Sequence, residues 1–168
     1  MHIMTVCLGN ICRSPAAEAV LVRRLAEAGL DSVSVSSAGT ADYHVGELPH
    51  PTSVAEGERR GYVFRTRGAQ FEPADFDRAD LVVAMDSSNE AELLGLARTA
   101  QDRAKVVRLG AFADDTTHGV LDVPDPWGEP DLAYLAMYDQ IEEGVAGLVR
   151  ALQEGTVEQV AAAHRASR

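Results

Sequence analysis

The chain has 168 residues, 46% of them hydrophobic and 24% charged, which is typical of one globular domain with its own core. A formal net charge of −11 argues against nucleic acid or an anionic membrane as the main partner, so an anionic ligand needs a locally positive site. Because the chain has only two cysteines, no secretion signal and no apolar run of about 20 residues, we expect a monomeric cytoplasmic protein.

Short apolar runs and helical patterns alternate along the chain. The runs predict strands over residues 3–8, 33–35, 81–85 and 106–109. Apolar residues three and four positions apart predict helices over residues 14–28, 51–60, 87–98 and 134–152. Ser14 is the expected N-cap of the first helix and Pro15 its first helical position. This order predicts an α/β fold, a four-stranded parallel sheet with helices on both faces.

No linker divides the chain, so residues 1–153 are expected to form a single domain. The last segment, residues 154–168, is expected to fray into a mobile tail. Residues 110–130 form the one long connection, and long connections in compact domains are usually functional or disordered.

The loop after the first strand has the character of an anion-binding site. In "VCLGNICRSP", residues 6–15, the chain turns through Gly9 and Asn10 into a helix, and both residue types tolerate unusual backbone angles. A helix N-terminus and a cluster of peptide N–H groups bind phosphate-like anions readily. Arg13 adds a planar guanidinium that can hold two oxygens at once. Ligands also bind at this end of parallel strands.

Cys7 lies at the base of this predicted ring. The peptide dipoles, the helix N-terminus, Arg13 and the Ser14 hydroxyl all favour its thiolate over its thiol. The sequence therefore predicts a nucleophilic cysteine. The loop is not a nucleotide P-loop, because the G-x-x-x-x-G-K-[ST] pattern with its lysine is absent.

The string "VCLGNICRSP" resembles the signature of the low molecular weight protein tyrosine phosphatases. Further similarities are "SSAGT" at 36–40, "HVGE" at 44–47, "LVVAMD" at 81–86 and "VPDPW" at 123–127. The resemblance implies the same four-stranded fold and hydrolysis of protein phosphotyrosine through a cysteinyl-phosphate, without metal or cofactor. It implies that Cys7 and Arg13 are catalytic. It also implies a phosphate-binding loop made of Leu8, Gly9, Asn10, Ile11, Cys12, Arg13 and Ser14.

A phenolate leaving group requires a proton donor, and "DVPDPW" offers Asp122 and Asp125. Asp125 is the preferred candidate because Pro124 and Pro126 restrict the backbone on both sides of it. Asp125 also matches the catalytic acid of the family.

The resemblance assigns supporting roles as well. Trp127 and Tyr43 are expected to form the walls of the substrate slot, and Asn10 to fix the strained loop. Ser37 is expected to orient Asn10, and Asp86 to be structural, as a helix cap.

Cys12 is expected to protect Cys7 by forming a reversible disulfide with it upon oxidation.

Two positions depart from the family's pattern. Residues 66–70 read TRGAQ where many relatives have a histidine that braces the loop, so the loop must be supported otherwise. Trp127 is followed by Gly128 where many relatives have a second aromatic residue, which implies a wider pocket.

Three alternatives stay open at this point. Protein arginine phosphatases of the same fold also have one aromatic residue followed by glycine, but they usually have threonine where this chain has the apolar Ile11. An arsenate reductase would need further cysteines, and a phosphate-binding module would need neither Cys7 nor Asp125. Asp114, Asp115 and His118 resemble a metal loop, but we interpret them as a solvated acidic loop and expect no metal.

Overall fold

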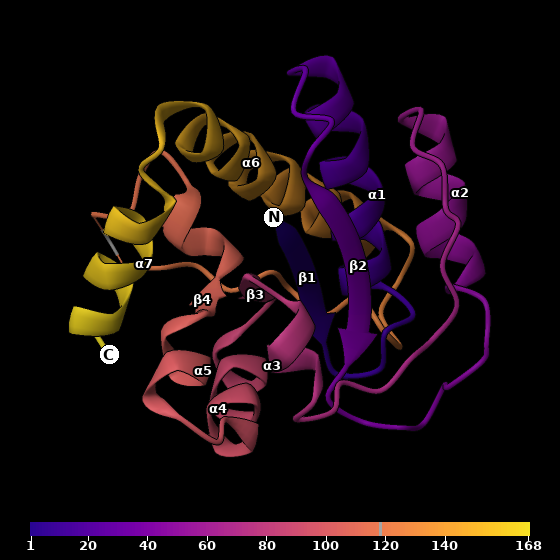
Figure 1. The fold of residues 1–168 in the computed structure, drawn as a ribbon. Helices are drawn as coiled ribbons and strands as arrows, with labels where there is room; N and C mark the ends of the chain where they lie inside the picture. The colour runs from indigo at the N-terminus through magenta and orange to yellow at the C-terminus, as the bar shows by residue number, and fades with distance from the viewer. Residues whose placement is uncertain (118) are drawn as a thin grey trace.

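The sheet of the computed structural model, which describes residues 1–117 and 119–168, is four-stranded and parallel, in the order β2-β1-β3-β4 (Figure 1). Its strands are β1 (His2–Cys7), β2 (Ser34–Gly39), β3 (Leu81–Ala84) and β4 (Val106–Arg108). After β2 the chain crosses to the other side of β1, so the strand order reverses at β1. Ligands in such sheets bind at this switch point, beyond the carboxyl ends of the strands.

Helices cover both faces of the sheet, as the sequence predicted. One face carries α1 (Arg13–Glu27) and α6 (Leu132–Glu154), and the other carries α3 (Asp75–Arg78) and α4 (Ser87–Leu96). The remaining helices are α2 (Pro51–Arg59), α5 (Ala100–Ala104), the 3-10 helix η1 (Leu109–Phe112) and α7 (Val157–Ala166).

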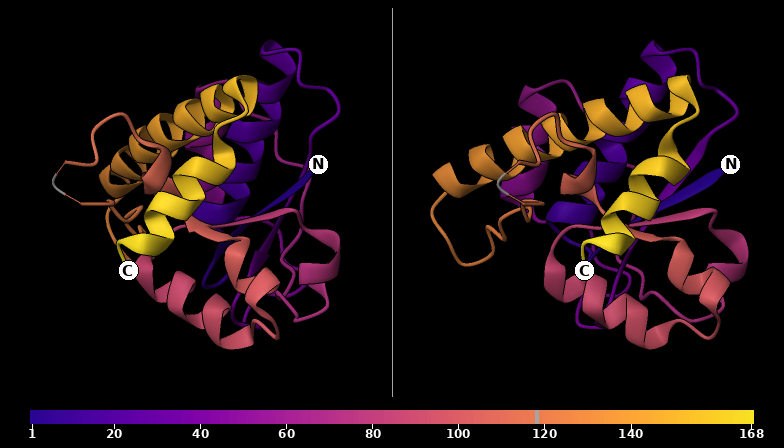
Figure 2. Two further views of the ribbon diagram at one scale, coloured as in Figure 1. Left: turned by 60° about the vertical axis from the view of Figure 1, so that its left-hand side comes forward. Right: turned by 90° about the vertical axis from the view of Figure 1, so that its left-hand side faces the viewer.

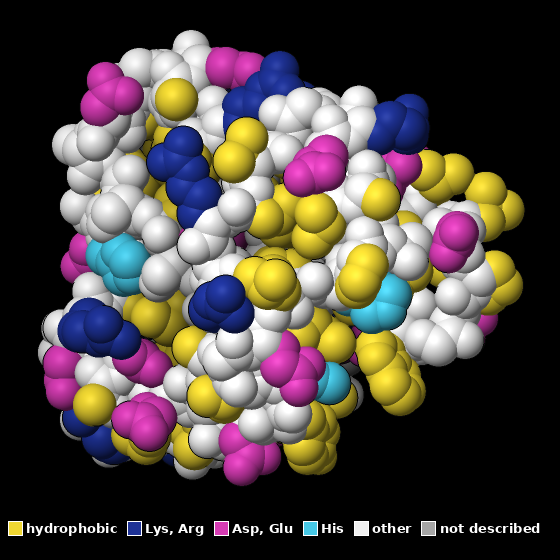
Figure 3. Space-filling model, turned by 90° about the vertical axis from the view of Figure 1, so that its right-hand side faces the viewer, with side chains coloured by type: hydrophobic (Ala, Val, Ile, Leu, Met, Phe, Trp, Pro, Cys, Tyr) yellow, Lys and Arg dark blue, Asp and Glu magenta, His cyan; other side chains and the backbone are white. Residues whose placement is uncertain are grey.

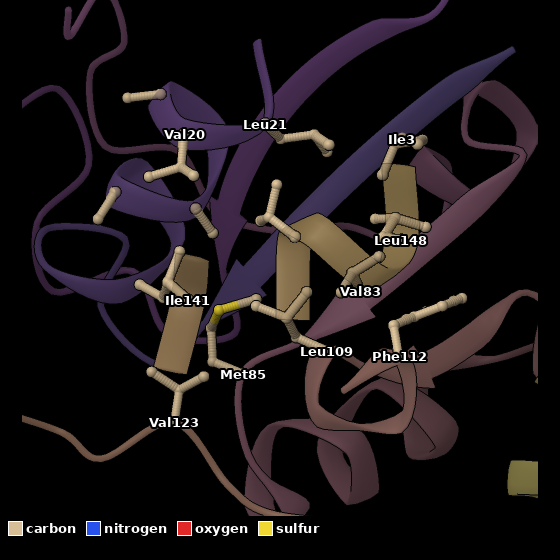
Figure 4. Packing of buried hydrophobic residues seen from close by; sticks show 14 of the residues in the cluster. Ile3, Val20, Leu21, Val83, Met85, Leu109, Phe112, Val123, Ile141 and Leu148 are labelled. Carbon is tan, nitrogen blue, oxygen red and sulfur yellow. The ribbon is translucent and has the colours of Figure 1, made fainter. Parts of the chain in front are cut away.

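Alternate residues of β1 belong to two separate cores. Ile3 packs with α1, α6 and η1 in the larger core shown in Figure 4, whereas Met4 and Val6 pack with α3 and α4. Val123 joins the larger core although it lies in the long connection before α6. This two-sided burial explains why the first and third predicted strands are almost continuously apolar.

β2 is longer than predicted and includes two serines. The expectation for residues 33–35 followed apolar runs alone, but Ser36 and Ser37 continue the strand because their hydroxyls have partners. Ser36 Oγ lies 2.8 Å from His2 Nε2, and Ser37 Oγ accepts a hydrogen bond from Asn10 Nδ2 at 3.0 Å. Polar residues therefore belong to this edge strand.

Residues 154–168 differ from the expected frayed tail. Gly155, at φ 71°, ends α6, and α7 follows with Ala161 and His164 buried. Figure 2 shows α7 beside β4, the edge strand that it contacts. The sequence did not predict α7 for two reasons. The apolar stripe of this alanine-rich helix is weak, and the buried partner of His164, which is Glu90, is distant in sequence. Within the described residues, no helix is long and apolar enough to cross a membrane.

Candidate active site

The loop after β1 turns directly into α1. β1 ends at Cys7 and α1 begins at Arg13, with Cys12 as its N-cap rather than the expected Ser14. Ser14 is not the cap because its hydroxyl faces the inside of the loop, toward Cys7. Asn10 adopts the left-handed backbone conformation, with φ 53°. It is one of the two loop residues that the sequence predicted to tolerate unusual backbone angles.

Cys7 is 3% exposed and its sulfur is surrounded by hydrogen-bonding groups. The Asn10 backbone N–H donates to Cys7 Sγ at 3.3 Å, and Ser14 Oγ lies 3.1 Å from the same atom. The loop leads from Cys7 to the start of α1, whose first N–H groups have no intrahelical partners. The sulfur therefore lies at the base of a loop that is rich in hydrogen-bond donors.

Asn10 holds the loop together through its side chain. Its Nδ2 donates to Ser14 Oγ at 2.8 Å and to Ser37 Oγ at 3.0 Å, and its Oδ1 accepts from the Ala69 N–H at 2.9 Å. The Ser37 hydroxyl in turn donates to Glu18 Oε2 at 2.5 Å. This network supports the loop where many relatives use a histidine. Glu18 is a contributor that the sequence pattern did not single out.

Gly39 is a second contributor that was missed. A Cβ atom at this position would lie 2.6 Å from the Leu8 carbonyl oxygen and 3.0 Å from the Asn10 nitrogen. The Thr40 N–H donates to the Cys7 carbonyl at 2.9 Å directly beside it. Glycine at the end of β2 therefore allows the loop to pack against the strand.

Glu18 makes the stability of the loop depend on pH. Burial raises the pKa of its carboxyl group, against the opposing hydrogen bonds from Ser37 and Thr66. A raised folded-state pKa stabilises the fold fully below the unfolded value of 4.5, and this contribution is lost as the pH rises through the folded value.

We therefore expect Glu18→Gln to remove part of the pH dependence of stability. Urea unfolding at several pH values between about 4.5 and 8 measures it for both proteins. The free energy of unfolding of the wild type should decrease relative to that of E18Q as the pH rises. Parallel curves for the two proteins would contradict this assignment.

Arg13 is the buried cation of the site. Its side chain is 3% exposed, with Nη1 bonded to Asp86 and 3.3 Å from the Val123 carbonyl oxygen, and Nη2 2.9 Å from Asp125 Oδ2. Burial acts to lower the pKa of Arg13, but Cys7 and the hydrogen bond to Asp86 act in the opposite direction and leave the pKa raised. The guanidinium therefore stays charged, and it supplies the positive site that an acidic chain needs for an anion.

Asp122 and Asp125, the two candidates for the proton donor, lie in different surroundings. Asp125 reaches Arg13 and lines the pocket, with 43% of its side chain exposed. Asp122 accepts from the Ser87 N–H at 3.0 Å, from the Ser87 hydroxyl at 2.8 Å and from Arg108 Nη1 at 2.9 Å. Asp86 caps α4 by accepting from the Asn89 N–H at 2.6 Å. Only Asp125 of these three is a lining residue of the pocket.

A pocket of about 200 Å³ opens above the loop. Its walls include Tyr43 and Trp127, whose side chains are 70% and 63% exposed, together with the almost buried Ile11. His44, which had no assigned role, also lines it and bonds to Glu47 at 2.8 Å. The other lining residues are Cys7, Leu8, Gly9, Cys12, Arg13 and Asp125. Asn10, Ser14 and Ser37 support the loop from outside the pocket.

Cys12 differs from Cys7 in its surroundings. Burial raises the pKa of the Cys12 thiol to about 12. Its Sγ lies 3.9 Å from Tyr134 Oη, which lies 3.1 Å from His50 Nδ1. The two cysteines are both free, and both line the pocket. At neutral pH, Cys12 is therefore a thiol.

The first two arginines of the basic stretch RRGYVFRTR, residues 59–67, are paired with neighbouring carboxylates. Arg59 and Arg60 both bond to Glu56, and Arg60 also reaches Asp139 and Glu142. Basic and acidic side chains are interspersed on the face shown in Figure 3. Within residues 1–117 and 119–168, no three metal-binding side chains form a group that could hold an ion. His118, from the loop that resembles a metal site, lies outside the described residues.

Comparisons with known proteins identify the family of this chain. The sequence profile described as low molecular weight phosphotyrosine protein phosphatase matches residues 2–158. A low molecular weight protein-tyrosine-phosphatase of Streptomyces coelicolor is 40% identical over 150 residues, 89% of this chain and 92% of that protein.

Two solved structures have a similar fold. A protein tyrosine phosphatase from Entamoeba histolytica superposes with a TM-score of 0.87 at 34% identity, covering 94% of this chain and 99% of its own. A Drosophila arginine phosphatase superposes with a TM-score of 0.84 at 28% identity, covering 91% and 98%. Because the profile spans nearly the whole sequence and the relatives align over most of theirs, this chain belongs to the low molecular weight phosphotyrosine protein phosphatase family.

Proposed function

We propose that this protein hydrolyses phosphotyrosine in phosphorylated proteins through a cysteinyl-phosphate intermediate. The observation that carries the proposal is the convergence of three groups on one pocket: the sulfur of Cys7, the guanidinium of Arg13 and the carboxyl of Asp125. These groups are a nucleophile, an anion-binding group and a proton donor, the three functions that transfer of a phosphoryl group from a phenol requires.

In the first step the Cys7 sulfur attacks phosphorus in line with the phenolic oxygen. The S–P bond forms as the P–O bond to tyrosine breaks, and Asp125 gives its proton to the leaving oxygen. Arg13 and the peptide N–H groups of the loop hold the non-bridging oxygens, where charge concentrates in the transition state. A phosphate oxygen replaces the Asp125 carboxylate at Arg13 Nη2, which frees Asp125 to act as the acid.

In the second step water attacks the cysteinyl-phosphate. Asp125, now ionised, takes a proton from that water as the P–S bond breaks, and inorganic phosphate leaves. The Ser14 hydroxyl, 3.1 Å from Cys7 Sγ, donates a hydrogen bond to the departing thiolate. Both steps use Cys7 and Asp125, with Arg13 and Ser14 in support, and neither requires a metal ion.

The pocket lining favours an aryl group next to the phosphate. Ile11 presents an apolar side chain, and Tyr43 and Trp127 provide flat walls for a ring. A phosphoarginine guanidinium would find no hydrogen-bond acceptor on Ile11. The likeness to a Drosophila arginine phosphatase, together with Gly128 after Trp127, makes phosphoarginine the second candidate substrate.

Matched peptides that carry either phosphotyrosine or phosphoarginine separate the two candidates. We expect kcat/KM to be at least about 10-fold higher for the phosphotyrosine peptide, because Tyr43 and Trp127 provide walls for a ring and Ile11 offers a buried guanidinium no hydrogen-bond acceptor. Phosphate release measures both reactions. A higher kcat/KM for the phosphoarginine peptide would overturn the substrate assignment while leaving the cysteine chemistry intact.

We further propose that the protein acts as a monomer in the cytoplasm, where its two free cysteines stay reduced. Cys12 protects the site there. A Cys7 sulfenic acid, formed by peroxide, condenses with the Cys12 thiol to a disulfide and water, and thiol reductants reverse it.

A further inference from the structure

Arg108 lies outside the pocket, yet it holds the segment that leads to the catalytic acid. Its Nη1 donates to the Val120 carbonyl at 3.2 Å and to Asp122 Oδ1 at 2.9 Å. Asp122 is bound at the same time by the N–H and hydroxyl of Ser87, at the start of α4. Three residues after Asp122 comes Asp125.

Arg108 is itself fixed by a buried carboxylate. Glu90 of α4 has a side chain that is 7% exposed, and its Oε2 lies 3.0 Å from Arg108 Nε in an ion-pair contact. Glu90 Oε1 is 2.7 Å from His164 Nε2 of α7 and 2.6 Å from Arg168 Nη2. A chain of polar contacts thus runs from His164 of α7 and from Arg168, through Glu90 and Arg108, to Asp122.

The segment between Asp122 and Asp125 is anchored at one more point. Val123 is buried in the larger core, as Figure 4 shows, and its N–H donates to the Met85 carbonyl at 2.8 Å. Pro124 follows and restricts the backbone. Asp122 and Val123 are therefore two neighbouring fixed points, and only Pro124 separates them from Asp125.

The reaction itself creates the need for this support. Asp125 has one ion-pair contact, at Arg13 Nη2, and the phosphate of a substrate takes that position. During catalysis the carboxyl must then be held over the leaving oxygen by its own backbone and by the Trp127 N–H, which donates to Asp125 Oδ1 at 3.2 Å. The Arg108–Asp122 pair anchors the chain on the other side of Asp125, also without involving Arg13.

From these contacts we infer that Arg108 is a positioning residue for Asp125, with Glu90 and α7 as its support. The inference rests on the proposed function and deepens it. Arg108 touches neither the substrate nor the nucleophile. Its loss should therefore impair proton donation by Asp125 and leave the attack by Cys7 unchanged.

The test compares two aryl phosphates with different leaving groups. Phenyl phosphate needs a proton donor, whereas 2,4-dinitrophenyl phosphate has a stable leaving anion and needs none. For Arg108→Met we expect kcat/KM for phenyl phosphate to fall about 10-fold, because a small displacement of a catalytic group is costly, with little change for 2,4-dinitrophenyl phosphate. Asp122→Ala removes the half-exposed partner of Arg108 and should likewise lower kcat/KM for phenyl phosphate alone.

Arg150→Met is the matched control. Arg150 pairs with Asp114, at an exposed site earlier in the same connection, so its loss should leave both values of kcat/KM unchanged. Equal losses on both substrates for R108M and D122A, or no loss on either, would overturn the inference. The proposed function is tested separately by two measurements on the wild type and R150M. Both proteins should turn over aryl phosphates, and a phosphate group should be trapped on Cys7 during the reaction.

Discussion

Replacing Cys7 by serine should abolish turnover and preserve the phosphate site. We expect kcat for p-nitrophenyl phosphate to fall by at least about 10⁴-fold, because a serine hydroxyl does not ionise in this site and is a much weaker nucleophile than the cysteine sulfur. Arg13 and the loop amides stay in place, so inorganic phosphate should still bind. Steady-state kinetics measures the first result, and isothermal titration calorimetry with phosphate measures the second.

The fold of C7S provides the control for this result. The side chain is buried and small, and serine is nearly isosteric with it, so thermal unfolding should change little. A C7S protein that is folded and retains a tenth of the wild-type kcat would exclude Cys7 as the nucleophile.

Replacing Asp125 by asparagine should slow the reaction in a way that depends on the leaving group. General acid catalysis contributes about 10² to 10⁴-fold, so kcat/KM for phenyl phosphate should fall by that factor. The decrease should be much smaller for 2,4-dinitrophenyl phosphate, whose anion leaves without a proton. Initial rates with the two substrates measure the difference.

Asp115→Asn is a matched control for D125N because Asp115 lies in the same connection and, within residues 1–117 and 119–168, its hydrogen bonds are local, from Thr117. It should behave as the wild type with both substrates. If D125N loses the same factor on both substrates, Asp125 contributes to binding or structure and another group is the acid.

Much of the fold follows from the sequence because its signals are local. The apolar runs of β1 and β3 are buried on both faces, and their length and spacing identify parallel strands directly. β2 was underestimated because Ser36 and Ser37 are stabilised by partners distant in sequence, which no local pattern reveals. The same reason applies to α7, whose His164 is buried against Glu90 of α4.

The site shows the same division. The residues of one contiguous loop, Cys7 to Ser14, could be predicted because strand, turn and helix follow each other in sequence. Asp125 could be distinguished from Asp122 by its two flanking prolines. Glu18 and Arg108 could not be found in this way, because each acts through another side chain that only the fold brings near. Residues that support the site through another side chain are therefore found only in the structure.

The central claim is that the Cys7 sulfur is the reactive nucleophile at the base of an anion-binding loop, and its alkylation tests this most directly. Iodoacetamide reacts with thiolates, and mass spectrometry distinguishes Cys7 from Cys12. We predict rapid modification of Cys7 that is slowed by added phosphate, with Cys12 unmodified because its pKa is about 12. Labelling of Cys7 that is as slow as that of Cys12, and that phosphate does not affect, would contradict the claim.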